Sequence, residues 1–148
     1  MTLATSRRRG MPAVGSRRRA VIACAAPEKE QTLIETLREF EIEPVPSKSM
    51  DVIRALLTSD ETVLAFSQTK FGEWCFQDVL NAADSPGPKV PVVVCSEFYD
   101  NDLYVYVMAM GAFDFLAFPY RQEEVKWIIH TALNRGSGRL EALRRGAA

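Results

Sequence analysis

Five short apolar runs alternate with segments of helical periodicity along this chain, and that alternation restricts its fold more than any other feature. The runs begin near residues 20, 42, 62, 90 and 113. Three of them, Ala20–Cys24, Thr62–Phe66 and Val90–Cys95, are rich in apolar residues, as strands buried on both faces of a sheet are. A strand followed by a helix, repeated five times, predicts an α/β fold with a doubly wound, five-stranded parallel sheet.

Start and stop signals divide the intervening segments into five helices. Pro27 suits the first turn of one helix, and Ser49 and Asp100 are suitable N-caps for two others. A third helix is expected over Gly72–Ala83, and the last over Glu123–Leu133. Gly111 is expected to end the fourth helix, and Ser85-Pro86-Gly87-Pro88 to stop the third.

Prolines and alternation locate the edges of the sheet. Pro44 and Pro46 fall in the second run, Ile42–Val45, and proline is tolerated chiefly in edge strands. The fifth run, Phe113–Phe118, alternates around Asp114 in the manner of an edge strand. These two runs are therefore expected at the edges of the sheet.

Charge is distributed unevenly over the 148 residues. Residues 1–19 hold six arginines and no acid, residues 135–148 hold four arginines and one glutamate, and the interior carries a net charge of −10. We expect an arginine-rich tail over residues 1–18, one domain over 19–134 and a C-terminal tail over 135–148. Because the domain is acidic, nucleic acid is not an expected partner of its folded body.

Several classes of protein are excluded by what the sequence lacks. No apolar run approaches the roughly 20 residues of a transmembrane helix, and no apolar core of a secretory signal follows the first arginines. The three cysteines, Cys24, Cys75 and Cys95, are spaced too irregularly for a disulfide framework or a zinc site. These features predict a cytoplasmic protein without a bound cofactor.

Two stretches resemble the receiver domain of two-component response regulators, the CheY-like family. Val92–Ser96 is similar to the family's strand that ends in a switch hydroxyl. Gly111–Tyr120, with the sequence GAFDFLAFPY, is similar to the family's Gly-Ala-x-x-[Tyr/Phe]-Leu-x-Lys-Pro-[Phe] segment. The resemblance extends from Ala20 to Leu133, about three-quarters of the chain, and implies a receiver fold with the strand order 2-1-3-4-5.

The same resemblance implies a phosphorylation pocket from which the reactive residues are missing. The acidic pair after the first strand aligns with Ala25 and Ala26, and the phosphorylated aspartate aligns with Ser67, or with Phe66 if the register shifts by one. The lysine of the family aligns with Phe118. Only the switch hydroxyl, at Ser96, and the rotameric aromatic residue, at Phe115, are retained.

The chemistry of the family depends on the residues that are absent. Magnesium prefers oxygen ligands and usually has one or two carboxylates among them. Phosphoryl transfer depends on positioning and on stabilisation of charge by a metal and a cation. We therefore expect no magnesium site, no aspartyl phosphorylation and no enzymatic activity.

An aromatic group in the C-terminal third of the chain corresponds to the surface that receivers use for dimerisation and effector docking. The fourth helix, fifth strand and fifth helix form that surface in the family. Tyr104, Tyr106 and Tyr120 are the residues expected to be exposed there, with Phe115 as the switch residue. Exposed aromatic residues favour a protein partner, such as a regulator, kinase or effector, or a second copy of this chain.

The preferred interpretation is a receiver-like signalling module that binds a protein partner without being phosphorylated on an aspartate. One alternative is a phosphorelay receiver whose acids have moved, with Glu28, Glu73 and Glu97 as the nearest substitutes. Another is an arginine-rich tail that docks to nucleic acid or membrane while the acidic domain recruits a partner. A small flavodoxin-like or hydrolase-like enzyme is the third, although neither a cofactor loop nor a nucleophile with its base is found.

Overall fold

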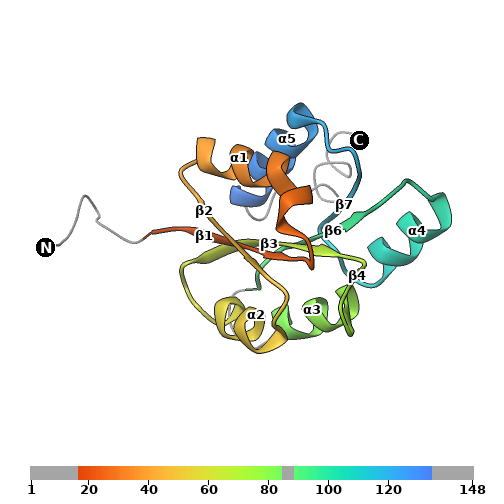
Figure 1. Cartoon of the computed structure of the whole chain (residues 1–148), viewed down its shortest axis with the longest axis horizontal. Coiled ribbons are helices and arrows are strands. Elements are labelled where there is room, and N and C mark those ends of the chain that lie inside the picture. The colour runs from red at the N-terminus through yellow and green to blue at the C-terminus, as the bar shows by residue number, and fades with distance from the viewer. Residues whose placement is uncertain (1–16, 85–88, 135–148) are drawn as a thin grey trace, which may run out of the picture.

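The computed structural model describes residues 17–84 and 89–134, which form one parallel sheet between two layers of helices (Figure 1). The strands of this sheet are β1 (Arg19–Ala23), β2 (Glu43–Ser47), β3 (Thr62–Gln68), β6 (Val92–Ser96) and β7 (Asp114–Ala117). Their order is β2-β1-β3-β6-β7, and every neighbouring pair is parallel. The predicted α/β class and the 2-1-3-4-5 order of the five sheet strands are confirmed.

Helices cover both faces of the sheet. They are α1 (Gln31–Glu39), α2 (Met50–Leu57), α3 (Phe76–Ala83), α4 (Asn101–Ala109) and α5 (Gln122–Leu133), and a short 3-10 turn, η1 (Pro27–Glu30), precedes α1. In Figure 1, α1 and α5 lie above the sheet, α2 and α3 lie below it, and α4 stands beside β6 and β7. The right-handed crossovers of a parallel sheet require helices on both sides in this way.

Alternate residues of the strands supply the two sides of the core. On β1, Ala20 and Ile22 pack with α1 and α5, whereas Val21 and Ala23 pack with α2 and α3. A third cluster joins Val94 and Phe115 to α3 and α4. The central strands are buried on both faces, which is why their sequences are apolar runs without alternation.

The predicted capping residues begin two of the helices. The Ser49 side chain accepts a hydrogen bond from the Val52 amide at the start of α2, and Asp100 accepts one from the Asp102 amide at the start of α4. Gly111 follows α4 with a φ of 109°, a conformation that disfavours residues with a Cβ atom. These local signals were sufficient to place both helices.

The predicted helix over Gly72–Ala83 is wrong in its first turn. Residues Lys70–Phe71 and Trp74–Cys75 form an antiparallel hairpin, β4–β5, and α3 begins only at Phe76. Gly72, with a φ of 65°, occupies the first position of the two-residue loop, where glycine is favoured. Asp78 then accepts a hydrogen bond from the Cys75 amide at 3.0 Å, which fixes the start of the helix.

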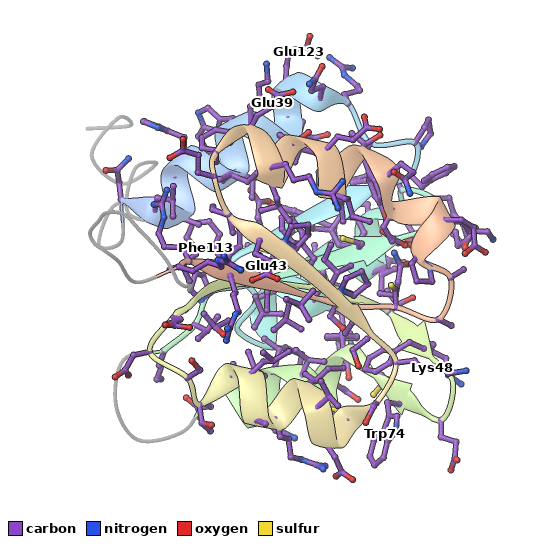
Figure 2. All side chains as sticks on the ribbon, turned by 60° about the vertical axis from the view of Figure 1, so that its left-hand side comes forward. Glu39, Glu43, Lys48, Trp74, Phe113 and Glu123 are labelled. Carbon is purple, nitrogen blue, oxygen red and sulfur yellow. The ribbon has the colours of Figure 1, made fainter. Side chains whose placement is uncertain are left out.

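The hairpin rests against α2. The guanidinium group of Arg54 lies 5.5 Å from the centre of the Trp74 ring, within the range of a cation–π contact. Trp74 is at the lower edge of the molecule in Figure 2, below Lys48. Its neighbour in the hairpin, Phe71, is 1% exposed and belongs to the core on this side of the sheet.

β2 and β7 are the edges of the sheet, as the sequence predicts. Pro44 and Pro46 of β2 lie opposite Ala20 and Ile22 of β1. The Glu43 amide donates to the Arg18 carbonyl at 2.9 Å, so the residue before the first proline points its N–H group toward β1.

Arginines 17–19 contact the start of the sheet. Arg17 and Arg19 form ion pairs with Glu43 at 3.6 and 3.5 Å, and Arg19 forms another with Glu61 at 3.3 Å. Glu43 is labelled on β2 in Figure 2. The remainder of the expected N-terminal tail, the expected C-terminal tail and the stop signal at 85–88 lie outside the described residues.

Candidate functional site

The carboxyl ends of β1, β3, β6 and β7 meet along one edge of the sheet. Ala23 pairs in register with Ser67, Gln68 pairs with Cys95, and Ser96 pairs with Ala117. Doubly wound sheets bind their ligands outside this edge, where the connecting loops leave the strands. We refer to it as the carboxyl edge.

The residues predicted for the phosphorylation pocket are gathered at this edge but differ in burial. Ser67 and Ser96 are buried, at 0% and 3% exposure. Ala25 is exposed and Ala26 is half-buried, in the loop between β1 and η1. Phe118, at the lysine position, is 46% exposed. The positions expected to supply acids and a cation therefore present methyl groups and a phenyl ring.

Both buried hydroxyl groups are used inside the protein. The Ser67 hydroxyl donates to the Gln68 carbonyl at 2.9 Å. Ser96 Oγ accepts from the Phe98 amide at 3.4 Å, in the loop that leads to α4. Within the described residues, the hydrogen bonds of these two hydroxyl groups are to backbone groups of neighbouring residues.

A triad of Glu30, Gln68 and Tyr120 joins three segments of the carboxyl edge. Gln68 Nε2 donates to Glu30 Oε2 at 2.8 Å and to the Tyr120 hydroxyl oxygen at 2.9 Å. The Tyr120 hydroxyl donates to Glu30 Oε1 at 3.2 Å. Glu30 ends η1, Gln68 ends β3, and Tyr120 follows β7. Glu30 and Tyr120 are 3% and 8% exposed, so the triad is an internal network.

Burial changes the acidity of the groups around the triad. It raises the pKa of Glu30, and the nearby charge of Glu97 acts in the same direction, whereas Tyr120, Gln68 and Lys29 oppose the shift. Burial and the charge of Glu30 raise the pKa of Cys24 to about 12. The pKa values of Cys95 and Tyr120 are raised for the same principal reason, burial.

These raised values mean that the thiols of Cys24 and Cys95 are protonated at neutral pH. The thiolate is the nucleophilic form of cysteine, so both residues serve as buried apolar side chains, as predicted from their apolar surroundings.

Sequence reasoning missed the triad. In the sequence, Glu30 is an acid in the first turn of a helix, where its charge would interact favourably with the helix dipole. No local pattern indicates that its side chain is buried. Gln68 and Tyr120 are 38 and 90 residues away from it in the sequence. Cys24, the first residue after β1, was likewise not among the predicted site residues.

The side chains at the carboxyl edge do not fit the magnesium ion that the fold implies. Magnesium requires several oxygen ligands in near-octahedral geometry. Glu30 is the buried carboxylate at this edge, and each of its oxygens already accepts a hydrogen bond. Among residues 17–84 and 89–134, no group of three or more His, Cys, Asp or Glu residues is arranged to hold a metal ion.

The predicted partner residues are only partly exposed. Tyr106 of α4 is 48% exposed, in agreement with the prediction, and Tyr104 is half-buried. The expectation that Tyr120 faces outward is wrong, because its hydroxyl is drawn into the triad. Phe115 is buried, and Tyr99 and Tyr104 pack against it with ring centres at 6.2 and 5.8 Å.

Several large apolar and aromatic side chains are exposed on α4 and in the segments that flank it. These side chains, which we call the α4 surface, are Phe98, Tyr99, Val105, Tyr106 and Met110, with exposures of 64%, 60%, 56%, 48% and 44%. The exposed phenyl ring of Phe118 follows β7, the strand next to β6, and its amide donates to the Ser96 carbonyl at 2.8 Å. Large exposed apolar patches on a protein often mark interaction sites.

The charged residues in the segment that carries the α4 surface are all acidic. Residues 90–120 contain no lysine, arginine or histidine, whereas Glu97, Asp100 and Asp102 are exposed there. Lys29, from η1, reaches Glu97 at 4.0 Å and is itself 63% exposed. An apolar surface with an acidic rim is complementary to apolar and basic side chains.

No helix in the described part of the chain has the length and apolar character needed to cross a membrane. His130, the one histidine of the sequence, is exposed on α5, where its ring nitrogen lies 3.4 Å from the amide nitrogen of Asn134.

Comparison with known proteins shows similarity in structure but not in sequence. No model of a known protein family matches the sequence, and no curated protein matches it either. A response regulator receiver domain protein from Clostridium thermocellum superposes with a TM-score of 0.69 at 18% identity, covering 80% of this chain and 96% of its own. A response regulator from Thermotoga maritima gives a TM-score of 0.68 at 16% identity, covering 80% of this chain and 99% of its own.

A two-component response regulator from Clostridium difficile is similar to the same extent, with a TM-score of 0.65, 15% identity, and coverage of 80% of this chain and 98% of its own. At such low identity the comparison establishes the fold and leaves the chemistry to be argued from the residues. The fold of this chain is that of the response regulator receiver domains.

Proposed function

We propose that this protein is a receiver-like signalling module that acts by binding a protein partner and is not phosphorylated on an aspartate. One observation is the main support for the absence of aspartyl phosphorylation. The residue that aligns with the phosphate acceptor of receivers is Ser67, the second-last residue of β3, which is fully buried and donates its hydroxyl proton to a backbone carbonyl. A hydroxyl in this position has neither the charge nor the access of an acceptor aspartate.

The surroundings of Ser67 support the same conclusion. Transfer of a phosphoryl group depends on charge stabilisation by a metal and a cation. Phe118 stands at the lysine position, Ala25 and Ala26 stand at the predicted acid positions, and the oxygens of Glu30 are hydrogen-bonded within the triad. The proposed role is therefore binding rather than catalysis.

The α4 surface supports the proposed binding of a protein partner. Protein interfaces are enriched in exposed aromatic side chains and in methionine, and this surface presents Phe98, Tyr99, Tyr106 and Met110. Because its rim is acidic, we expect the partner to contribute basic side chains around an apolar contact.

Incubation with acetyl phosphate and magnesium, followed by intact mass measurement, tests the absence of phosphorylation. We expect no gain in mass. A gain of one phosphoryl group that is lost on mild alkaline treatment would overturn the proposal and favour a phosphorelay receiver with relocated acids.

Partner binding is tested by affinity capture from the native host with two matched variants. Val105→Glu places a charge in the middle of the α4 surface, and Val52→Glu places one on α2, where the valine is 44% exposed. A partner of the α4 surface should be lost with Val105→Glu and retained with Val52→Glu. A partner retained by both variants, or lost with both, would contradict the assignment of this surface.

A further inference from the structure

We propose that the Glu30–Gln68–Tyr120 triad is a built-in lock that takes the place of an external ligand at the carboxyl edge and sets the position of the exposed ring of Phe118. The proposal concerns the regulation of the same site, and it rests on the proposed function only in taking the ring of Phe118 as part of the surface that a partner contacts. Such a lock requires that the triad connect separate segments of the chain, that it be buried, and that it contact a residue at the surface.

First, the triad must connect segments that would otherwise move independently. Its members come from η1, from the end of β3 and from the loop between β7 and α5, so the shortest path between any two along the chain is 38 residues. Each of the three side chains contacts both of the others. The triad therefore adds side-chain links between loops of the carboxyl edge that are distant in the sequence.

Second, the lock must be internal rather than a surface contact. Glu30 is 3% exposed and Tyr120 is 8% exposed. A buried carboxylate is costly unless it is hydrogen-bonded, and here Gln68 and Tyr120 provide one donor to each oxygen. Removing either donor leaves a buried acceptor unpaired, so the three groups hold their positions together.

Third, the triad must reach the surface. The Phe118 and Tyr120 rings are in contact edge to face, with their centres 5.5 Å apart and their planes at 86°. The Phe118 amide is fixed to the Ser96 carbonyl at 2.8 Å, so its backbone is held from the β6 side while its ring rests on Tyr120. A change at Glu30 can therefore pass through Tyr120 to an exposed phenyl ring.

Two variants test the lock by hydrogen exchange. Tyr120→Phe keeps the ring but removes the hydroxyl, and Glu30→Gln keeps the shape but removes the charge. In both, we expect amides in residues 27–31 and 117–121 to exchange about tenfold faster, because a hydrogen bond to a buried charged group is lost. The central part of β3, residues 62–66, should be unaffected. Tyr99→Phe, which removes an exposed hydroxyl bonded to Asn101, is the matched control.

A second measurement tests whether a change at Glu30 reaches the exposed ring of Phe118. The aromatic proton resonances of Phe118 should shift in Glu30→Gln, a substitution that does not touch Phe118. The double variant Glu30→Gln/Tyr120→Phe should lose less stability than the sum of the two single variants, because both remove the same interaction.

The outcomes separate this proposal from the proposed function. Unchanged exchange in both loops, or faster exchange spread evenly into β3, would overturn the lock, since the triad would then add nothing or only global stability. Unshifted Phe118 resonances or additive stabilities would also overturn it. None of these results depends on acetyl phosphate or on a captured partner, so each proposal can fail alone.

Discussion

The carboxyl group of Glu30 is removed from water where three segments meet, and this makes the stability of the protein depend on pH. Burial raises its pKa above the ordinary value of 4.5. In the folded state the protonated form is therefore favoured more than in the unfolded chain. Glu30 stabilises the fold fully below pH 4.5, and this contribution is lost as the pH rises to the folded pKa.

Glu30→Gln should remove this part of the pH dependence. We expect the free energy of unfolding of the variant, relative to that of the unaltered protein, to increase as the pH rises above 4.5. Urea denaturation at several pH values measures the difference. Other carboxylates titrate equally in both proteins, and a difference that stays constant or decreases with pH would contradict the assignment.

Motif and topology together predicted the positions of single residues where the contacts are local or follow from strand register. Ser67 is the second-last residue of β3 and Ser96 is the last residue of β6; both strands are recognisable from their apolar runs, and both serines lie at the carboxyl edge as expected. The burial of Tyr120 was not predicted, because it depends on a contact with Glu30 90 residues away. A tyrosine in a loop reads as exposed until its hydrogen-bond partner is known.

The N-terminal caps of α2 and α4 differ in the length of their hydrogen bonds. Asp100 Oδ1 accepts from the Asp102 amide at 2.9 Å, whereas Ser49 Oγ accepts from the Val52 amide at 3.4 Å. The shorter bond to a charged acceptor at a helix N-terminus is the stronger of the two.

Replacing the caps with alanine should show this difference. We expect Asp100→Ala to reduce the free energy of unfolding by about 1 kcal/mol, and Ser49→Ala to reduce it by less. Asp60→Ala, in the exposed turn between α2 and β3, is the control and should have no measurable effect. Urea denaturation gives all three values, and the reverse order of the two caps would show that the bond lengths do not govern their strength.

The β4–β5 hairpin is the element that the sequence pattern does not predict. The sequence pattern predicts a helix that begins at Gly72, although a glycine between Phe71 and Trp74 also suits a two-residue hairpin loop. The choice is made by tertiary packing, since Phe71 joins the core below the sheet and Trp74 lies over Arg54. Short elements of two residues carry too little local pattern to be recognised beforehand.

For the whole molecule, the residues of the carboxyl edge predict a fold that is indifferent to magnesium. A ligand that binds only the folded state raises the melting temperature, and the increase grows with the ratio of its free concentration to its Kd. With Ala25, Ala26 and Ser67 at the positions of the family's acids, we expect the melting temperature to be the same with and without millimolar magnesium at matched ionic strength. An increase of several degrees would require a metal site at this edge.

The two prolines of β2 affect whether the edge of the sheet can pair with a strand of a neighbouring molecule at high concentration. The Glu43 amide and the Ser47 carbonyl are bonded to the β1 side, so Pro44 and Pro46 occupy the positions that face away from the sheet. A strand from a neighbouring molecule would find no N–H donor at either position.

This border therefore resists the edge-to-edge stacking from which fibrils grow. Pro44→Val/Pro46→Val would restore both donors, and we expect light scattering of the concentrated variant to increase with time while the unaltered protein stays clear. Equal scattering from the two would mean that something other than the missing donors protects this border.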